Sequence, residues 1–71
     1  MYNPAREKAV ARARFQTELT SRPHEVWYHA NHGWYVVDPE TETPRPGASL
    51  TARVFYMDPV RDRYVTIEQH D

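Results

Sequence analysis

The 71-residue chain contains no cysteine, which excludes disulfides, thiolate metal ligands and thiol catalysis. It has only two glycines, too few for a glycine-rich loop that cradles phosphate. No run approaches the ~18 apolar residues that span a bilayer. The N-terminus also lacks an apolar segment of the signal-peptide type. We therefore expect a soluble, non-exported protein that forms one small domain without a membrane contact.

Charge is unevenly distributed along the chain. Residues 1–22 hold five basic and two acidic side chains, whereas residues 23–71 hold four arginines and eight carboxylates. Binding along a nucleic acid normally requires a basic excess, which the larger part of this chain lacks. The dipolar distribution fits a protein-binding module with one basic and one acidic face.

Residues 3–20 are predicted to form a helix. Asn3 is a favourable N-cap, a proline follows at the first helical position, and alanine, arginine, glutamate and lysine dominate the segment. Pro23 disfavours continuation of the helix. We expect Phe15 and Leu19 to dock on a sheet, which leaves an exposed basic helix face. That face is either a solvated helix end or a contact surface.

Residues 25–38 are predicted to form a β-hairpin. Two runs rich in β-branched and aromatic residues flank an Asn-His-Gly turn signal. Both tryptophans and two of the five tyrosines lie in this stretch. Because a small chain depends on a few large side chains for packing, we expect this hairpin to nucleate the core.

The register of this hairpin decides which aromatics share a face. A three-residue loop at 31–33 would pair Ala30 with Trp34 and Tyr28 with Val36. The opposite face would then carry Trp27, His29, Tyr35 and Val37. A two-residue loop would shift these pairings, and the sequence leaves both registers open. Because both faces are apolar, one can cover the core while the other needs the helix, another strand pair or a partner.

The rest of the chain predicts a connector and a second hairpin. Residues 39–48 contain three prolines and one glycine, which indicates an exposed, semi-extended loop that is a solvated connector or a binding arm. Residues 50–68 alternate as two strands around a turn at 58–62, and 69–71 form a frayed tail. We predict an α+β domain with an N-terminal helix packed on a small antiparallel sheet of two hairpins, which share a meander-like logic.

The sequence gives little support for a metal site or for an enzymatic active site. His24, His29 and His32 lie near Asp38 in sequence, but strand alternation and turn placement do not bring them to one point, as zinc requires. The serines lack a nucleophile-elbow context, and no carboxylate lies in an apolar setting that would tune an acid–base pair. We therefore predict no metal, no cofactor and no enzymatic activity.

Two binding functions remain. Aromatics and arginines on a small sheet are typical of stacking platforms for single-stranded nucleic acid, here Tyr35, Arg53, Phe55, Arg63 and Tyr64. With the basic helix they define the alternative function, a small nucleic-acid-binding domain. Protein–protein interfaces favour the same residue types, and nine aromatics exceed what so small a core can hide. Exposed strand edges would also accept a target segment.

The whole chain resembles the small transcription regulators of lytic phages that infect Xanthomonas. The resemblance runs from Met-Tyr-Asn-Pro-Ala-Arg-Glu-Lys through Val-Trp-Tyr-His-Ala-Asn-His-Gly-Trp-Tyr-Val-Val-Asp to Tyr-Val-Thr-Ile-Glu. It implies binding to the host RNA polymerase at the N-terminal region of the β′ subunit and at the β flap. It also implies displacement of σ during initiation, antitermination during elongation, and action in the cytoplasm of the bacterial host.

The resemblance carries no contact residues, so we predict them from the residues themselves. One predicted contact surface is the hairpin face with its neighbouring strand: Trp27, His29, Tyr35, Arg53 and Phe55. The other is the basic helix: Arg6, Lys8 and Arg12. We expect a monomer that binds polymerase in competition with σ, without direct contact to nucleic acid.

Overall fold

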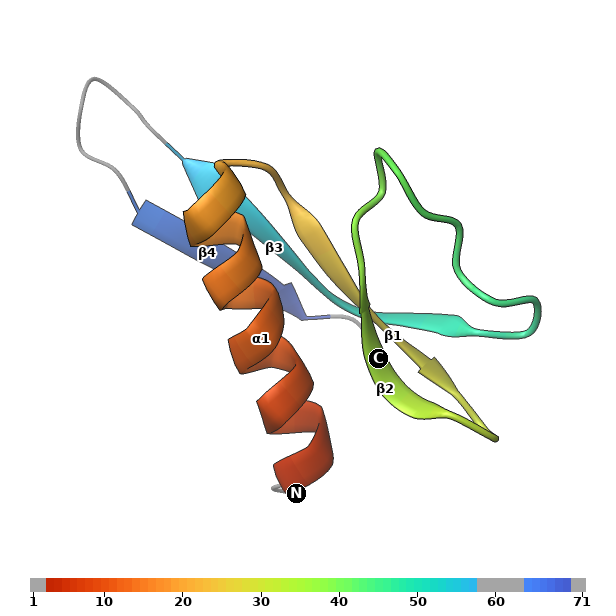
Figure 1. The fold of residues 1–71 in the computed structure, drawn as a ribbon. Helices are drawn as coiled ribbons and strands as arrows, with labels where there is room; N and C mark the ends of the chain where they lie inside the picture. The colour runs from red at the N-terminus through yellow and green to blue at the C-terminus, as the bar shows by residue number, and fades with distance from the viewer. Residues whose placement is uncertain (1–2, 58–63, 70–71) are drawn as a thin grey trace.

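A computed structural model describes residues 3–57 and 64–69. One helix, α1 (Pro4–Thr20), packs on one face of a four-stranded antiparallel sheet (Figure 1). The strands are β1 (His24–His29), β2 (Gly33–Val37), β3 (Ser49–Met57) and β4 (Tyr64–Gln69). The predicted α+β fold of a helix on two hairpins is confirmed. The predicted turn at 58–62 lies outside the described residues.

Helix α1 begins and ends where its capping residues predict. The side chain of Asn3 accepts hydrogen bonds from the backbone N–H groups of Ala5, at 3.1 Å, and Arg6, at 3.3 Å. Ser21 adopts the left-handed conformation with φ 58° and donates its N–H to the Thr17 carbonyl at 2.9 Å. These contacts satisfy backbone groups that a helix end leaves unpaired. This helix lacks the length and apolarity to cross a membrane.

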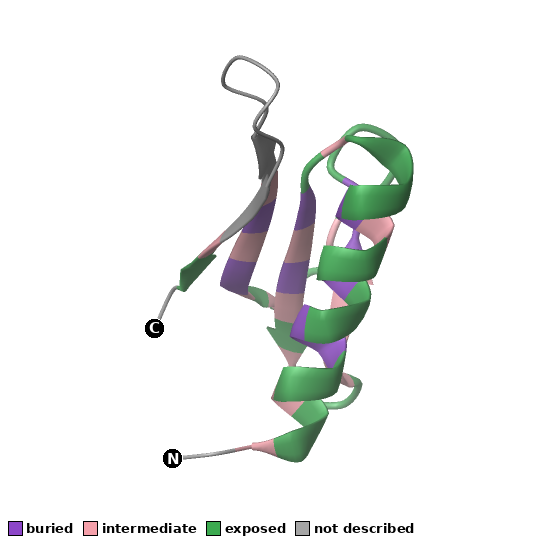
Figure 2. Cartoon of the chain, turned by 90° about the vertical axis from the view of Figure 1, so that its left-hand side faces the viewer, coloured by how far each residue is buried: buried purple, intermediate pink, exposed green. Residues whose placement is uncertain are grey.

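Small side chains make the contact between helix and sheet. Ala9, Val10, Ala13 and Thr17 are buried on α1, on the side that Figure 2 shows facing the strands. The prediction that Phe15 and Leu19 dock on the sheet is wrong, because their residues are 60% and 69% exposed. The alanine and valine positions recur every three to four residues and form a narrow apolar stripe of their own. Phe15 and Leu19 point away from that stripe.

The first hairpin has a three-residue loop, but its register differs from the predicted one. Tyr28 pairs with Trp34 and His29 with Gly33, so the loop comprises residues 30–32. The His32 N–H donates to the His29 carbonyl at 3.1 Å, and Gly33 takes a φ of +72°. Because the pairing moves by two positions, the residues on each face stay as predicted. The rings of Tyr28 and Trp34 lie 4.7 Å apart between centroids.

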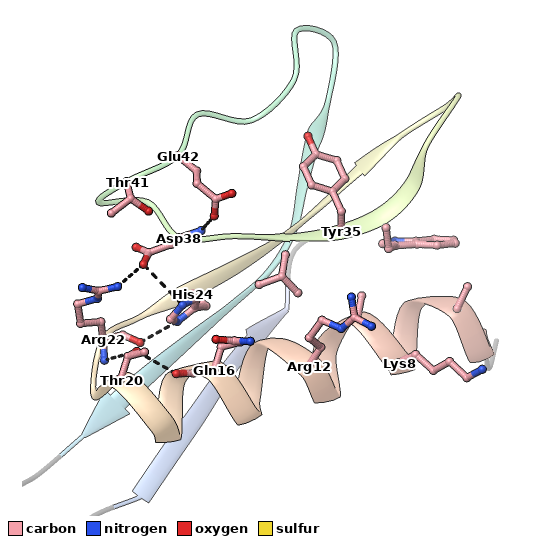
Figure 3. A pocket seen from close by; sticks show the side chains of 14 residues that line it. Lys8, Arg12, Gln16, Thr20, Arg22, His24, Tyr35, Asp38, Thr41 and Glu42 are labelled. Atoms are coloured by element: carbon pink, nitrogen blue, oxygen red, sulfur yellow. Dashed lines mark hydrogen bonds and ion pairs between the residues drawn. The ribbon is translucent and has the colours of Figure 1, made fainter.

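The strand order β2-β1-β3-β4 differs from a meander. β1 lies between β2 and β3, so the connection of residues 38–48 must cross β1 to begin β3. We call this segment the crossover connection. It passes on the side of the sheet away from α1, because the Arg45 N–H donates to the hydroxyl of Tyr35 at 2.9 Å, and Tyr35 points away from the helix (Figure 3).

The core is built from smaller residues than the sequence predicts. Its buried members are Ala9, Val10, Ala13, Val26, Ala52 and Val54, with Trp34, Val36 and Ile67 packed against them. The largest fully buried side chains are Val26, Val54 and Thr17. The first hairpin thus supplies Val26 to this cluster, buries Val37 as well, and places Trp34 at the margin of the core.

Strand β4 includes a residue that the sequence assigned to the frayed tail. Gln69 pairs with Ala52 of β3, and its side-chain oxygen accepts a hydrogen bond from the guanidinium of Arg6. This contact connects the first turn of α1 to the edge of the sheet. Residues 70–71 lie outside the described residues.

We expect Ala13→Leu to lower the free energy of unfolding by about 1–3 kcal/mol, because Ala13 is fully buried and a larger side chain overpacks the contact. Ala11→Leu makes the same change on the exposed side of the same helix and should stay within about 0.5 kcal/mol of wild type. Urea unfolding followed by tryptophan fluorescence measures both. Equal losses in the two variants would contradict the helix orientation.

Candidate partner-binding site

The sheet face away from α1 carries the predicted aromatic residues. Trp27 pairs with Leu50 across β1 and β3, and a β-bulge between Val26 and Trp27 shifts the register there. Beyond the bulge, Arg53 and Phe55 follow Leu50 along the same face by strand alternation. Trp27, Leu50, Arg53 and Phe55 are all half-buried. We call Trp27, Leu50, Arg53 and Phe55, with Glu25 between them, the open sheet face.

Glu25 connects the members of the open sheet face. One carboxylate oxygen accepts a hydrogen bond from the Trp27 indole N–H at 3.0 Å, and the other accepts from Nε of Arg53 at 3.0 Å. The guanidinium of Arg53 lies 5.8 Å from the centre of the Phe55 ring. These contacts fix Trp27, Arg53 and Phe55 in a row before any partner arrives. Such preorganisation lowers the entropic cost of binding.

The other two predicted contact residues of this face lie next to Trp27: Tyr35 is its cross-strand neighbour on β2, and His29 follows it two residues further along β1. Tyr35 contacts the crossover connection through its hydrogen bond with the Arg45 N–H. His29 lies next to Gly47 of the same connection, since a Cβ built at Gly47 would lie 4.0 Å from Nε2 of His29. The pKa of His32 at the hairpin tip is lowered by desolvation and, next, by the charge of Arg45. The crossover connection therefore lies against Tyr35 and His29, beside the row of Trp27, Arg53 and Phe55.

The three predicted helix cations lie on two different sides of α1. Arg6 points toward β4, where it contacts Gln69 and lies 3.7 Å from the Glu7 carboxylate. Lys8 and Arg12 lie one turn apart on the side of the helix nearest β2 (Figure 3). Neither has an ion-pair or hydrogen-bond partner among residues 3–57 and 64–69. The structure thus brings Lys8 and Arg12 together and separates Arg6 from them.

A groove of about 570 Å³ runs between α1 and β2 (Figure 3). One wall is the helix stripe that contains Lys8 and Arg12, and the other is the outer strand β2. Its remaining lining residues are Ala5, Ala9, Gln16, Thr20, Arg22, His24, Trp34, Tyr35, Val36, Asp38, Thr41 and Glu42. We call this hollow the helix–strand groove.

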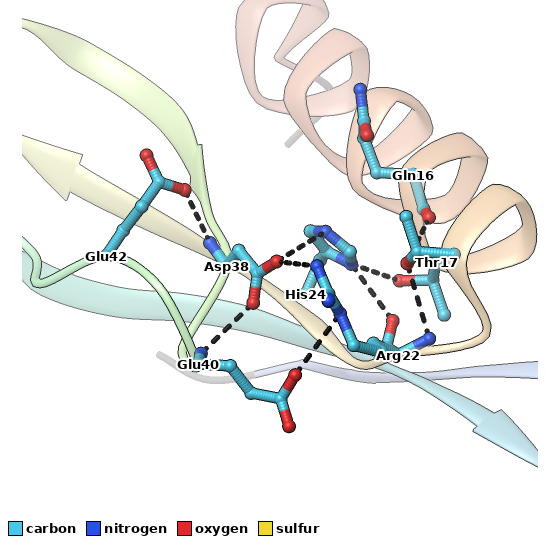
Figure 4. A network of polar contacts seen from close by, with 8 residues as sticks. Gln16, Thr17, Arg22, His24, Asp38, Glu40 and Glu42 are labelled. Atoms are coloured by element: carbon cyan, nitrogen blue, oxygen red, sulfur yellow. Dashed lines mark hydrogen bonds and ion pairs between the residues drawn. The ribbon is translucent and has the colours of Figure 1, made fainter.

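A network of polar side chains closes one end of the groove (Figure 4). Asp38 forms an ion pair with Arg22 and lies 3.8 Å from Nε2 of the buried His24. Nδ1 of His24 lies 3.2 Å from the hydroxyl of Thr17 and 3.0 Å from the Arg22 carbonyl. The Asp38 N–H donates to the Glu42 carboxylate at 2.9 Å. The network therefore joins α1, β1 and the start of the crossover connection.

The Asp38 carboxyl is held in its ionised form. Its pKa lies below the ordinary value of about 3.8, first because the Glu40 N–H donates to it at 3.0 Å. Desolvation opposes this effect, and the guanidinium of Arg22 adds to it. A lowered carboxyl pKa means that the folded state favours the charged form, so this contribution to stability is lost as the pH falls through the folded pKa.

The histidines lie at separate places in the fold. His24 is buried under α1, whereas the rings of His29 and His32 lie 5.0 Å apart at the hairpin tip. Within the described ranges, no group of three or more histidine, aspartate or glutamate side chains could hold a metal ion.

Sequence reasoning missed the role of Glu25 and the existence of the groove. Glu25 begins the aromatic run and alternates with Trp27, which indicates a shared face, but its pairing with Arg53 depends on the strand order. The groove had a partial signal, since Lys8, Arg12, Gln16 and Thr20 recur every four residues and predict one polar helix side. Nothing in the sequence placed that side beside β2.

No protein-family model, curated protein sequence or solved structure matches the chain.

We expect the unfolding free energy of the protein to fall as the pH drops below about 4, and Asp38→Asn to reduce this fall, because the substituted side chain no longer titrates. Urea unfolding midpoints between pH 2 and 7 measure the effect. Glu18→Gln, an exposed carboxylate change on α1, serves as the control and should retain the wild-type pH dependence. Parallel curves for wild type and Asp38→Asn would contradict the ionised Asp38 network.

Proposed function

We propose that this chain is a protein-binding regulator of transcription that acts on the RNA polymerase of a bacterial host. It binds the N-terminal region of β′ and the β flap, displaces σ during initiation and promotes antitermination, in the host cytoplasm. The choice of polymerase rests on the resemblance to phage transcription regulators. The regulator acts as a monomer and without enzymatic chemistry.

One observation supports a protein as the partner: the preorganised row of Trp27, Arg53 and Phe55 on the open sheet face. Tryptophan and arginine are the residue types most enriched at the energetic centres of protein interfaces. An acidic residue, Glu25, holds this row in place, which is unfavourable for approach of a phosphate backbone. The open sheet face therefore fits an apolar and charged protein segment better than a nucleic acid.

Phe55→Ala should weaken binding to purified host polymerase core enzyme about tenfold, since it removes an aromatic anchor worth more than about 1 kcal/mol. Biolayer interferometry with the immobilised regulator measures the dissociation constant, and release of fluorescent σ from holoenzyme measures displacement. Phe15→Ala removes the same side chain from an exposed position on α1 and should leave both readouts unchanged. Circular dichroism confirms that both variants are folded.

Two results would contradict the proposal. Wild-type protein that retains no polymerase subunit would exclude the partner. Salt-sensitive gel shifts with naked DNA or RNA, together with no polymerase binding, would instead assign the alternative function of a nucleic-acid-binding domain. Equal loss in Phe55→Ala and Phe15→Ala would leave polymerase as the partner but remove the open sheet face as its binding surface.

A further inference from the structure

We infer that the helix–strand groove binds an extended, acidic segment of a partner protein, which adds to the outer edge of β2 as a further strand. The groove lies on the other side of the first hairpin from the open sheet face. The inference therefore concerns a second binding site, and it does not depend on polymerase being the partner.

The first support is the position of β2 in the sheet. β2 pairs with β1 on one side, and no described strand pairs with its other side. Consecutive strand residues point to opposite faces, yet Trp34, Tyr35 and Val36 all line the groove. A hollow bordered by three residues in succession must run along the edge of the strand. At this edge the backbone groups of β2 that face away from β1 pair with no described strand, so an added strand can pair with them.

The second support is the charge of the opposite wall. Lys8 and Arg12 face the groove with no partner among the described residues, whereas Arg6, Arg14, Arg22 and Arg53 are each paired. Two carboxylates line the far end of the groove. Asp38 is held by Arg22 and the Glu40 N–H, and Glu42 accepts the Asp38 N–H, so the single charge of Glu42 stands against the two of Lys8 and Arg12. The unmatched charge of the groove is thus positive, and it selects acidic side chains.

The third support is the fit in length. From Lys8 to Thr20 the helix wall rises about 18 Å, at ~1.5 Å per residue. An extended segment covers that distance with five to six residues, at ~3.3 Å each. β2 itself has five residues, Gly33–Val37. A segment of this length pairs with all of β2 and places alternate side chains toward Lys8 and Arg12.

Phage display of random twelve-residue peptides on the immobilised full-length protein tests the inference. We expect enriched peptides in which aspartate or glutamate alternates with β-branched residues. A synthetic copy of an enriched peptide should bind at least about tenfold more weakly to Lys8→Gln/Arg12→Gln, which removes two charge-assisted contacts. Arg14→Gln/Arg45→Gln removes the same net charge away from the groove and should bind the peptide as wild type does.

Hydrogen exchange and NMR locate the peptide independently of the variants. Bound peptide should shift the amide signals of residues 34–36 and slow their exchange, and a proline at the centre of the peptide should abolish binding because it cannot donate to the ladder. Enrichment of basic peptides, no enrichment above a blank surface, or shifts confined to Trp27, Arg53 and Phe55 would overturn the inference. The second of these results would show that Lys8 and Arg12 only guard the edge.

A control with nucleic acid tests whether the groove binds phosphate groups instead of a peptide. Binding of a 20-nucleotide thymidine oligomer that Lys8→Gln/Arg12→Gln abolishes, without peptide enrichment, would assign the groove to phosphate and overturn the inference. Failure of the groove leaves the polymerase measurement with Phe55→Ala intact. Conversely, a peptide in the groove of a protein that retains no polymerase would overturn only the proposed function.

Discussion

The close contact between α1 and the sheet determines where the rings of Trp27, Trp34 and Phe55 lie. Ala9, Val10 and Ala13 of the helix pack against Val26, Ala52 and Val54 of the strands. Interiors pack at the density of organic crystals, so two layers that meet through such small groups leave no space for a ring between them. Trp34 therefore lies at the margin of the core, and Trp27 and Phe55 lie on the other side of the sheet. The surfaces available to a partner are a direct consequence of an alanine-rich contact.

The strand order adds a second constraint. Because β1 lies between β2 and β3, the crossover connection has to pass over the face that α1 leaves uncovered. It lies against Tyr35, the cross-strand neighbour of Trp27, whereas Phe55 lies further along the sheet on β3. The crossover connection is held at its start by Asp38. This residue forms an ion pair with Arg22, which precedes β1, and lies next to the buried His24 of β1. The same network closes one end of the helix–strand groove, so both proposed binding surfaces depend on how residues 38–48 are anchored.

The sequence predicted those features that depend on local chemistry. Asn3 and Pro23 predicted the helix ends, and strand alternation predicted the faces of the first hairpin, which a two-residue change of register leaves intact. The rotation of the helix was not predictable in the same way, because Phe15 and Leu19 offered a more hydrophobic side than the alanines that are in fact buried. The placement of β1 at the centre, and with it the Glu25–Arg53 pair, depends on contacts between residues 28 positions apart, for which the sequence carries no local signal.

The open sheet face and the helix–strand groove differ in how far their side chains are ordered before a partner binds, and therefore in the conformational entropy that binding would cost. On the open sheet face, Glu25 already holds Trp27 and Arg53, so binding of a partner there would order few side chains of this protein and would be favoured mainly by burial of the aromatic row. In the groove, the long side chains of Lys8 and Arg12 must be ordered by the incoming carboxylates, which offsets part of their attraction. Charges of this kind contribute more to encounter rate and to selection of acidic segments than to affinity. A partner that presents both an apolar element and a nearby acidic strand would contact opposite sides of the first hairpin. The groove would select the acidic segment, and the open sheet face would determine how slowly the complex dissociates.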